Sequence, residues 1–298
     1  MKSISKLVAI TFVLLAQGCT SFGTSDKNAA VMGQLVIAEP LAVNYKSEIA
    51  LARLTEVILR AELSDDQKAQ LYYDRGVIFD SVGLRSLARL DFNRALRLKN
   101  DLVDAYNFLG IHYTQLQEFN QAYDSFDSAL DLAPEHEYAY LNRGIALYYG
   151  GRPQLALEDF STFHQKQTDD PYRLLWLYLA EQKINIEDAK VKLKSRVELI
   201  NDRTWAKQII QLYLNEISQG EFIANLTYGI KSNKDLTDRL CEAYFYLGKY
   251  NQIQGQPHIA ANFFKLALST NVYEFVEHRY ARLELDLMRD TIAGSVEP

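Results

Sequence analysis

The chain of 298 residues is poor in the residue types that build metal, redox and nucleophilic sites. It has two cysteines, at positions 19 and 241, so no cysteine pair occurs at a metal-binding spacing. The five histidines are scattered, without the short spacings that place two ligands on one element. The sequence also lacks a glycine-rich phosphate loop and a nucleophile elbow. These absences predict a protein that is not an enzyme and that uses no cofactor or metal.

Positive charge is not in excess. The chain has 32 Lys and Arg against 38 Asp and Glu, which gives a formal net charge of −6. Surfaces that bind nucleic acid carry a basic excess, because phosphates dominate the affinity. Nucleic acid is therefore not an expected partner. A small-molecule substrate is not expected either, since no substrate-binding motif is present.

Long apolar runs are also missing, with one short exception at the start of the chain. Lys2 and Lys6 precede a segment from Leu7 to Ala16 that is almost wholly apolar. This segment is too short to remain as a membrane-spanning helix, and the pattern is typical of a secretory signal peptide. We predict a signal peptide over residues 1–18, with a permanent membrane anchor as the weaker alternative.

The residues before Cys19 resemble the bacterial lipobox, in which the cysteine receives a diacylglycerol and becomes the new N-terminus. Ala16 stands where the lipobox usually has leucine. Cys19 is the predicted lipidation site, and the alternative is a plain thiol after an ordinary cleavage site. Residues 19–45 would then form a tether, since they are rich in small and polar residues. By the bacterial sorting rule, Thr20 in place of aspartate favours the inner leaflet of the outer membrane, facing the periplasm.

What the sequence does contain is a repeat. Gly76, Gly110 and Gly144 are spaced 34 residues apart, in segments that share one pattern of small, aromatic and apolar residues. This period is the signature of the tetratricopeptide repeat, a unit of two helices joined by a turn. Stacked units bury a continuous core and present extended surfaces to partners. The sequence therefore predicts an all-α solenoid, and no segment shows the alternation of a strand.

The repeat register divides the rest of the chain. We expect three units in residues 69–170 and a further unit at 241–274. Between 171 and 240 the register fades, but apolar residues still recur at helical spacing and indicate degenerate helical pairs. Residues 46–68 predict an N-terminal helix and its connection. Residues 275–298 predict a capping helix and tail, because terminal repeats need a polar outer face.

Local signals mark the ends of the repeat helices. Ser64 and Gln67 have the spacing of a capping box that opens the first repeat helix. Gly83, Gly151 and Gly255 fall at one position of their units, between the two helices. Glycine is common there because it adopts the left-handed backbone that ends a helix.

Two chemically suggestive features have structural explanations. The adjacent residues Glu135, His136 and Glu137 fall between two units, so we interpret them as a solvated turn and not as a catalytic group. Once Cys19 carries a lipid, Cys241 is the remaining thiol, and no intrachain disulfide is possible. We expect Cys241 to be a small buried hydrophobe.

A partner-binding groove can be predicted from the repeat register, since in tetratricopeptide proteins fixed positions of each first helix line the concave face. Carried onto this chain, those positions are Tyr73, Val77, Asn107, Ile111, Gln115, Tyr138, Leu141, Ile145, Tyr148 and Tyr149. Grooves that clamp a free C-terminus use Lys, Arg and Asn here, and only Asn107 and Asn142 fit. We therefore expect an apolar or helical segment as the ligand. The alternative is that Tyr148 and Tyr149 pack against neighbouring helices.

Five stretches, several of which lie outside the generic repeat positions, resemble the NlpI family, the tetratricopeptide lipoproteins of the Gram-negative outer membrane. These stretches are Gln70–Arg89, Leu141–Arg152, Leu175–Lys183, Phe245–Lys249 and Asn271–Leu285. The resemblance implies a homodimeric adaptor that docks a periplasmic tail-specific protease and presents peptidoglycan endopeptidases to it. It also implies a role in cell-wall turnover and cell division.

Two other classes of function stay open. One is a structural repeat lipoprotein within an outer-membrane or pilus assembly complex. The other is an enzyme with an unrecognised site, which no motif supports.

Overall fold

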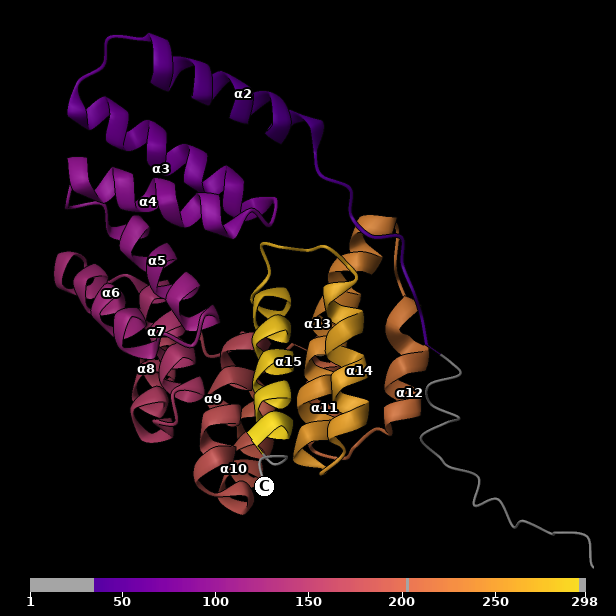
Figure 1. Cartoon of the computed structure of the whole chain (residues 1–298). Helices are drawn as coiled ribbons and strands as arrows, with labels where there is room; N and C mark the ends of the chain where they lie inside the picture. Colours follow the sequence, from indigo (N-terminus) through magenta and orange to yellow (C-terminus); the bar gives the residue numbers. More distant parts are fainter. Residues whose placement is uncertain (1–34, 202–203, 295–298) are drawn as a thin grey trace, which may run out of the picture. The chain divides into compact units, whose positions relative to one another are not determined.

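The computed structural model describes residues 35–201 and 204–294, and these residues form helices and turns without a strand. The expectation of an all-α chain is thus confirmed within these ranges. The predicted signal peptide and Cys19 lie outside the described residues. The described helices fall in one compact unit, which begins at Val36 (Figure 1). None of the described helices is long and apolar enough to cross a membrane.

The first eight helices run from the N-terminal helix to the end of the three predicted units and into the segment that follows. Their bounds are Tyr45–Arg60 (α2), Asp65–Ser81 (α3), Arg85–Leu98 (α4), Val103–Gln115 (α5), Phe119–Leu132 (α6), Glu137–Tyr149 (α7), Pro153–Lys166 (α8) and Pro171–Ile184 (α9). The remaining α-helices are Ile186–Arg196 (α10), Lys207–Tyr213 (α11), Gln219–Ala224 (α12), Asn233–Ile253 (α13), Pro257–Leu268 (α14) and Val276–Gly294 (α15).

Helices pack in pairs, and each pair packs on the next. The pairs that fall on the four predicted units are α3 with α4, α5 with α6, α7 with α8 and α13 with α14. In every pair a glycine on the first helix faces a phenylalanine ring on the second. The contacts are Gly76 with Phe92, Gly110 with Phe126, Gly144 with Phe160 and Gly248 with Phe264. A β-carbon at Gly110 would lie 2.6 Å from a ring atom of Phe126, so the helices can approach this closely only because the side chain is absent.

Side-chain caps begin three of these helices, α3, α7 and α13. Ser64 Oγ accepts from the Gln67 amide at 3.2 Å and Gln67 Oε1 accepts from the Ser64 amide at 2.9 Å, which confirms the capping box. His136 Nδ1 accepts from the Ala139 amide at 3.0 Å at the start of α7, and its Nε2 lies 3.0 Å from Asp104. Within this run, Glu135 is exposed in the turn as interpreted, whereas His136 caps α7 and Glu137 is the first residue of that helix.

The turn within each unit uses the left-handed backbone. Gly83, Gly151 and Gly255 have φ angles of 80°, 75° and 71°, which confirms the inference from their common position. In the second unit the same position is occupied by Gln117, with φ of 61°. Non-glycine residues pay a steric cost in this conformation.

The region between the third and fourth units is less regular. Helix α9 packs on α8 and α10 and is buried nearly all round, from Leu174 to Ala180. The chain then forms the short helices α11 and α12 before the 21-residue helix α13. Cys241 lies on α13 as a fully buried free thiol, which confirms its expected role as a small hydrophobe.

The last helix, α15, returns to the first helices of the units. It packs on α13 and α14 and also contacts α5 (Figure 1). This return places Tyr280 and Glu284 of α15 against Tyr149, one of the residues predicted to line the groove.

Candidate functional site

The ten predicted groove residues lie on the first helices α3, α5 and α7, and their exposure differs widely. Tyr138 has 54% of its surface exposed. Tyr73, Val77, Gln115 and Tyr149 are half-buried. The other five are buried, and they are Asn107, Ile111, Leu141, Ile145 and Tyr148. Among the ten, Tyr138 therefore offers the most surface to a partner.

Aromatic packing accounts for the burial at the end of α7. The Tyr149 ring stacks on Tyr280 of α15, with centroids 5.5 Å apart and 25° between the planes. The Tyr148 ring meets Trp176 of α9 edge to face at 6.2 Å. Such aromatic pairs stabilise a fold by about 1 kcal/mol beyond the area they bury. Tyr148 and Tyr149 thus pack against neighbouring helices, and a binding role for them stays a prediction.

A buried ion pair fastens α15 to α13 beneath these rings. Lys249 Nζ donates to Glu284 Oε1, and both side chains are nearly inaccessible to solvent. Glu284 Oε1 also accepts from the Tyr149 hydroxyl at 2.8 Å, and Oε2 accepts from Gln252 Nε2 at 2.7 Å. The Lys249 ammonium lies 4.9 Å from the centroid of the Tyr148 ring. Helices α7, α13 and α15 are therefore joined through one carboxylate.

The electrostatics of this pair hold both groups in their charged forms. Burial alone would raise the pKa of Glu284, but the Lys249 charge and three donated hydrogen bonds lower the pKa below its usual value. Burial alone would lower the pKa of Lys249, but Glu284 raises it. Burial also raises the pKa of the Tyr149 hydroxyl, which stays protonated and donates. With these contacts satisfied, the cluster has no free base, and it acts as a structural clasp.

A second polar cluster ties α15 to the first two units. His112 Nε2 of α5 lies 2.8 Å from Asp80 Oδ1 of α3, and Arg279 of α15 donates to Asp80 Oδ2. Burial lowers the pKa of His112. Burial would raise the pKa of Asp80, but the His112 hydrogen bond and the Arg279 charge lower it. The Asp80 carboxylate of α3 thus contacts both α5 and α15, although Asp80 and Arg279 are 199 residues apart in sequence.

The second and third units contribute a polar pair at the predicted groove. Asn142 Nδ2 donates to Asn107 Oδ1 at 3.1 Å, and both side chains are buried. The two asparagines that fit the pattern of a carboxylate clamp therefore bind one another. That a free C-terminus is not the ligand stays a prediction. Burial, and then the charges of Asp104 and Asp74, raise the pKa of Tyr73 to about 12.

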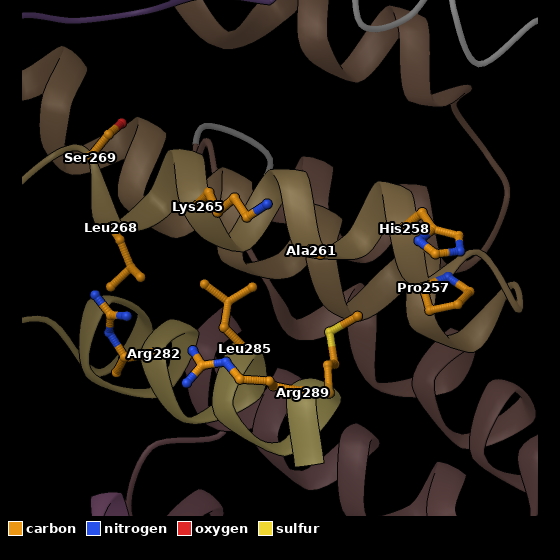
Figure 2. Close-up of a pocket in the computed structure, with 10 residues that line it drawn as sticks. Pro257, His258, Ala261, Lys265, Leu268, Ser269, Arg282, Leu285 and Arg289 are labelled. Atoms are coloured by element: carbon orange, nitrogen blue, oxygen red, sulfur yellow. The ribbon is translucent and has the colours of Figure 1, made fainter. Parts of the chain in front are cut away.

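Two large cavities adjoin α15. One, of about 620 Å³, is bordered by Tyr148, Tyr149, Lys183, Lys249 and Glu284, so it lies at the end of the predicted groove. The other, of about 820 Å³, runs between α14 and α15 (Figure 2). Its lining residues were not predicted from the sequence. Within the ranges that the structure describes, no three His, Cys, Asp or Glu side chains gather in a way that would hold a metal ion.

No protein-family model matches the chain. A solved tetratricopeptide repeat protein from Parabacteroides merdae is similar to it, with a TM-score of 0.52 and 16% identity over 83% of this chain and 100% of that one. The fold is an all-α tetratricopeptide-repeat solenoid. Weaker likenesses have TM-scores of 0.43 to Pseudomonas aeruginosa PilF (16% identity, 74% of this chain and 99% of that one) and 0.42 to YrrB, a tetratricopeptide protein with an unusual peptide-binding site (15% identity, 78% and 97%).

Proposed function

We propose that this chain is a lipid-anchored periplasmic adaptor of the kind found in the NlpI family. In this proposal it is not an enzyme, and it binds a tail-specific protease and peptidoglycan endopeptidases, and thereby regulates cell-wall turnover and cell division. The observation that carries the proposal is the stack of helix pairs, because such a solenoid presents extended surfaces to protein partners. The lipobox at Cys19 supports anchoring to a membrane. The stretches that resemble the NlpI family support the class of partner.

The mechanism we propose is proximity. An adaptor that holds a protease and its substrate together raises their effective concentration to roughly the millimolar range, without any chemistry of its own. A lipid on Cys19 would confine this assembly to the inner leaflet of the outer membrane, since acyl chains contribute about 0.8 kcal/mol for each buried CH₂. Degradation would then take place beside the cell wall, where the hydrolases act. A homodimer would double the number of docking surfaces.

The test is a crosslinked pull-down from native envelopes, with the lipidated protein compared with the Cys19→Ala variant and partners identified by mass spectrometry. We expect a tail-specific protease and wall hydrolases with the lipidated form, and fewer of both with Cys19→Ala. Recovery of a barrel or pilus complex alone would overturn the proposal in favour of the assembly factor. Hydrolysis of wall fragments by the purified protein alone would indicate an enzyme.

The predicted groove is tested with Tyr138→Ala, since Tyr138 is its most exposed member. Substituting Tyr148 or Tyr149 would instead disturb the packing on Trp176 and Tyr280. If the predicted groove binds a partner, Tyr138→Ala weakens the interaction about tenfold, as truncation of a contacting tyrosine commonly does. Unchanged affinity, with an unchanged melting temperature, would place the partner on another surface.

A further inference from the structure

The cavity between α14 and α15 has an apolar floor and a cationic border. Leu268 of α14 and Leu285 of α15 point into the space between the helices, and Lys265, Arg282 and Arg289 surround them (Figure 2). The cavity volume is about 820 Å³, and none of its lining residues is acidic. A groove with an apolar floor and charged edges is the form that receives an amphipathic helix.

The position of α15 explains why a groove is present. Helix α15 packs on α13 and α14 as α7 packs on α5 and α6, so it takes the place of the first helix of a further unit. In the preceding units a second helix then packs on the first. Within the described residues, which end at Gly294, no such helix follows α15. Among the described residues, the groove side of α15 therefore has no second helix packed on it, unlike the first helices of the preceding units.

The repeat register shows how the groove beside α15 differs from the surfaces on which the second helices of the units pack. Arg282 lies 34 residues after Gly248, at the position where glycine admits the second helix of a unit. Leu285 and Arg289 lie on the same face, three and seven residues further on. An arginine at the glycine position keeps a docking helix further away and adds positive charge. The groove therefore favours a helix that lies further from α15 than the second helix of a unit does and that carries negative charge.

The charges of the groove are mostly uncompensated. Lys265 and Arg282 are exposed, and among the described residues no carboxylate lies within ion-pair distance of either. Arg289 pairs with Asp286, three residues before it on the same helix. Arg282 also borders a neighbouring cavity of about 270 Å³ that is lined by Arg85. In a chain with a net charge of −6, this is a local concentration of positive charge.

We propose that the groove between α14 and α15 binds an acidic amphipathic helix of a partner protein. The proposal rests on the proposed function of the chain as an adaptor and assigns one docking surface for it. A second copy of this chain is a poorer occupant, because the helix that exposes apolar residues, α2, does not match the charge of the groove. Helix α2 exposes Ile49, Val57 and Leu59, but it has three basic and two acidic residues, so its charge does not complement the groove.

The first test measures binding of a fluorescent, terminally blocked peptide of about 18 residues, five helical turns, with leucines along one face and glutamates beside them. A matched peptide has lysine at every glutamate position. We expect the acidic peptide alone to bind, and the Lys265→Glu/Arg282→Glu variant to weaken binding by about tenfold or more at low salt. The charge-matched control is Lys194→Glu/Lys231→Glu, which changes exposed lysines on other elements and should leave binding unchanged. Equal binding of both peptides, or no effect of the groove variant, would overturn the proposal.

The second test identifies the natural occupant. A photocrosslinking residue replaces Ala261, which lines the groove on α14, and crosslinked peptides are sequenced from native envelopes. We expect a segment of another protein with acidic residues beside a helical apolar stripe. Crosslinks to this chain's own residues 290–298, to a second copy, or to lipid would overturn it. If Lys265→Glu/Arg282→Glu still recovers protease and hydrolases while losing the acidic peptide, the adaptor proposal stands and its partners dock elsewhere.

Discussion

Gln117 adopts a backbone conformation that the equivalent residues of three other units achieve with glycine. Its φ angle is 61°, against 80° at Gly83 and 75° at Gly151. A left-handed residue with a side chain costs about 1–2 kcal/mol relative to the right-handed form. Glycine avoids that cost but loses more entropy on folding, by roughly 0.5–1 kcal/mol. The balance favours glycine at this position.

We therefore expect Gln117→Gly to raise the free energy of unfolding by about 0.5 kcal/mol, measured by urea denaturation. The matched control is Gly151→Ala, because a β-carbon there meets no atom within 4 Å and tests the backbone alone. That variant should lower the free energy of unfolding by about 1 kcal/mol. A loss of stability in Gln117→Gly would show that interactions of the glutamine side chain outweigh its backbone cost.

At the scale of elements, the helix pairs were predictable and the position of α15 was not. Each pair is specified locally, by a glycine and a phenylalanine 16 residues apart, such as Gly110 and Phe126. Because this spacing is repeated along the chain, the helix pairs can be recognised in the sequence. Helix α15 is held by contacts distant in sequence, such as Asp80 with Arg279, which no local pattern encodes. The predicted groove positions lie on α3, α5 and α7, and their role stays a prediction; the sequence did not reveal that α15 packs against Tyr149, one of them. The sequence signal that α15 differs from the first helices of the units was Arg282, which stands where those helices have glycine.

The clasp between α13 and α15 gives a prediction at this scale. Lys249→Met leaves Glu284 buried without its cation, which should lower the free energy of unfolding by about 3–5 kcal/mol. Lys249→Met combined with Glu284→Leu removes both charges and should recover much of that loss, since an apolar pair of similar volume often replaces a buried ion pair without cost. Chemical denaturation measures both, and hydrogen exchange of α15 amides shows where the loosening occurs. A double variant as unstable as the sum of the single variants would contradict this account.

At the scale of the whole molecule, two buried carboxyls link the helices beyond the third unit. Glu242 of α13 accepts from the Tyr172 hydroxyl of α9 at 2.7 Å and from Trp205 Nε1 at 3.1 Å. Burial, and then the charge of Glu277 on α15, raise the pKa of Glu242 to about 8. Burial raises the pKa of Glu277 to about 7. Both carboxyls therefore keep their protons to a higher pH in the folded protein than an ordinary glutamate does.

The stability of the fold should therefore decrease as pH rises from about 6.5 to about 8. Between the usual glutamate pKa of 4.5 and these raised values, the folded state binds more protons than the unfolded state, so alkali favours unfolding. Below about pH 6.5 an opposing effect begins, because burial lowers the pKa of His112 and lowers that of His278 to about 4, and unfolding then takes up protons. We expect a loss of about 2 kcal/mol between pH 6.5 and 8, at up to about 1.4 kcal/mol per pH unit for each group.

The variant Glu242→Gln isolates one carboxyl of the pair. It keeps a side-chain oxygen that can accept from Tyr172 and Trp205, but it cannot ionise. Its free energy of unfolding should fall by about 1 kcal/mol or less over the same pH range, because the Glu242 proton and the repulsion of Glu277 by Glu242 are both removed. The matched control is Glu216→Gln, an exposed glutamate whose removal should leave the wild-type slope. If wild type and Glu242→Gln have the same slope in urea denaturation at stepped pH, Glu242 is ionised throughout, and its burial is compensated by the two donated hydrogen bonds.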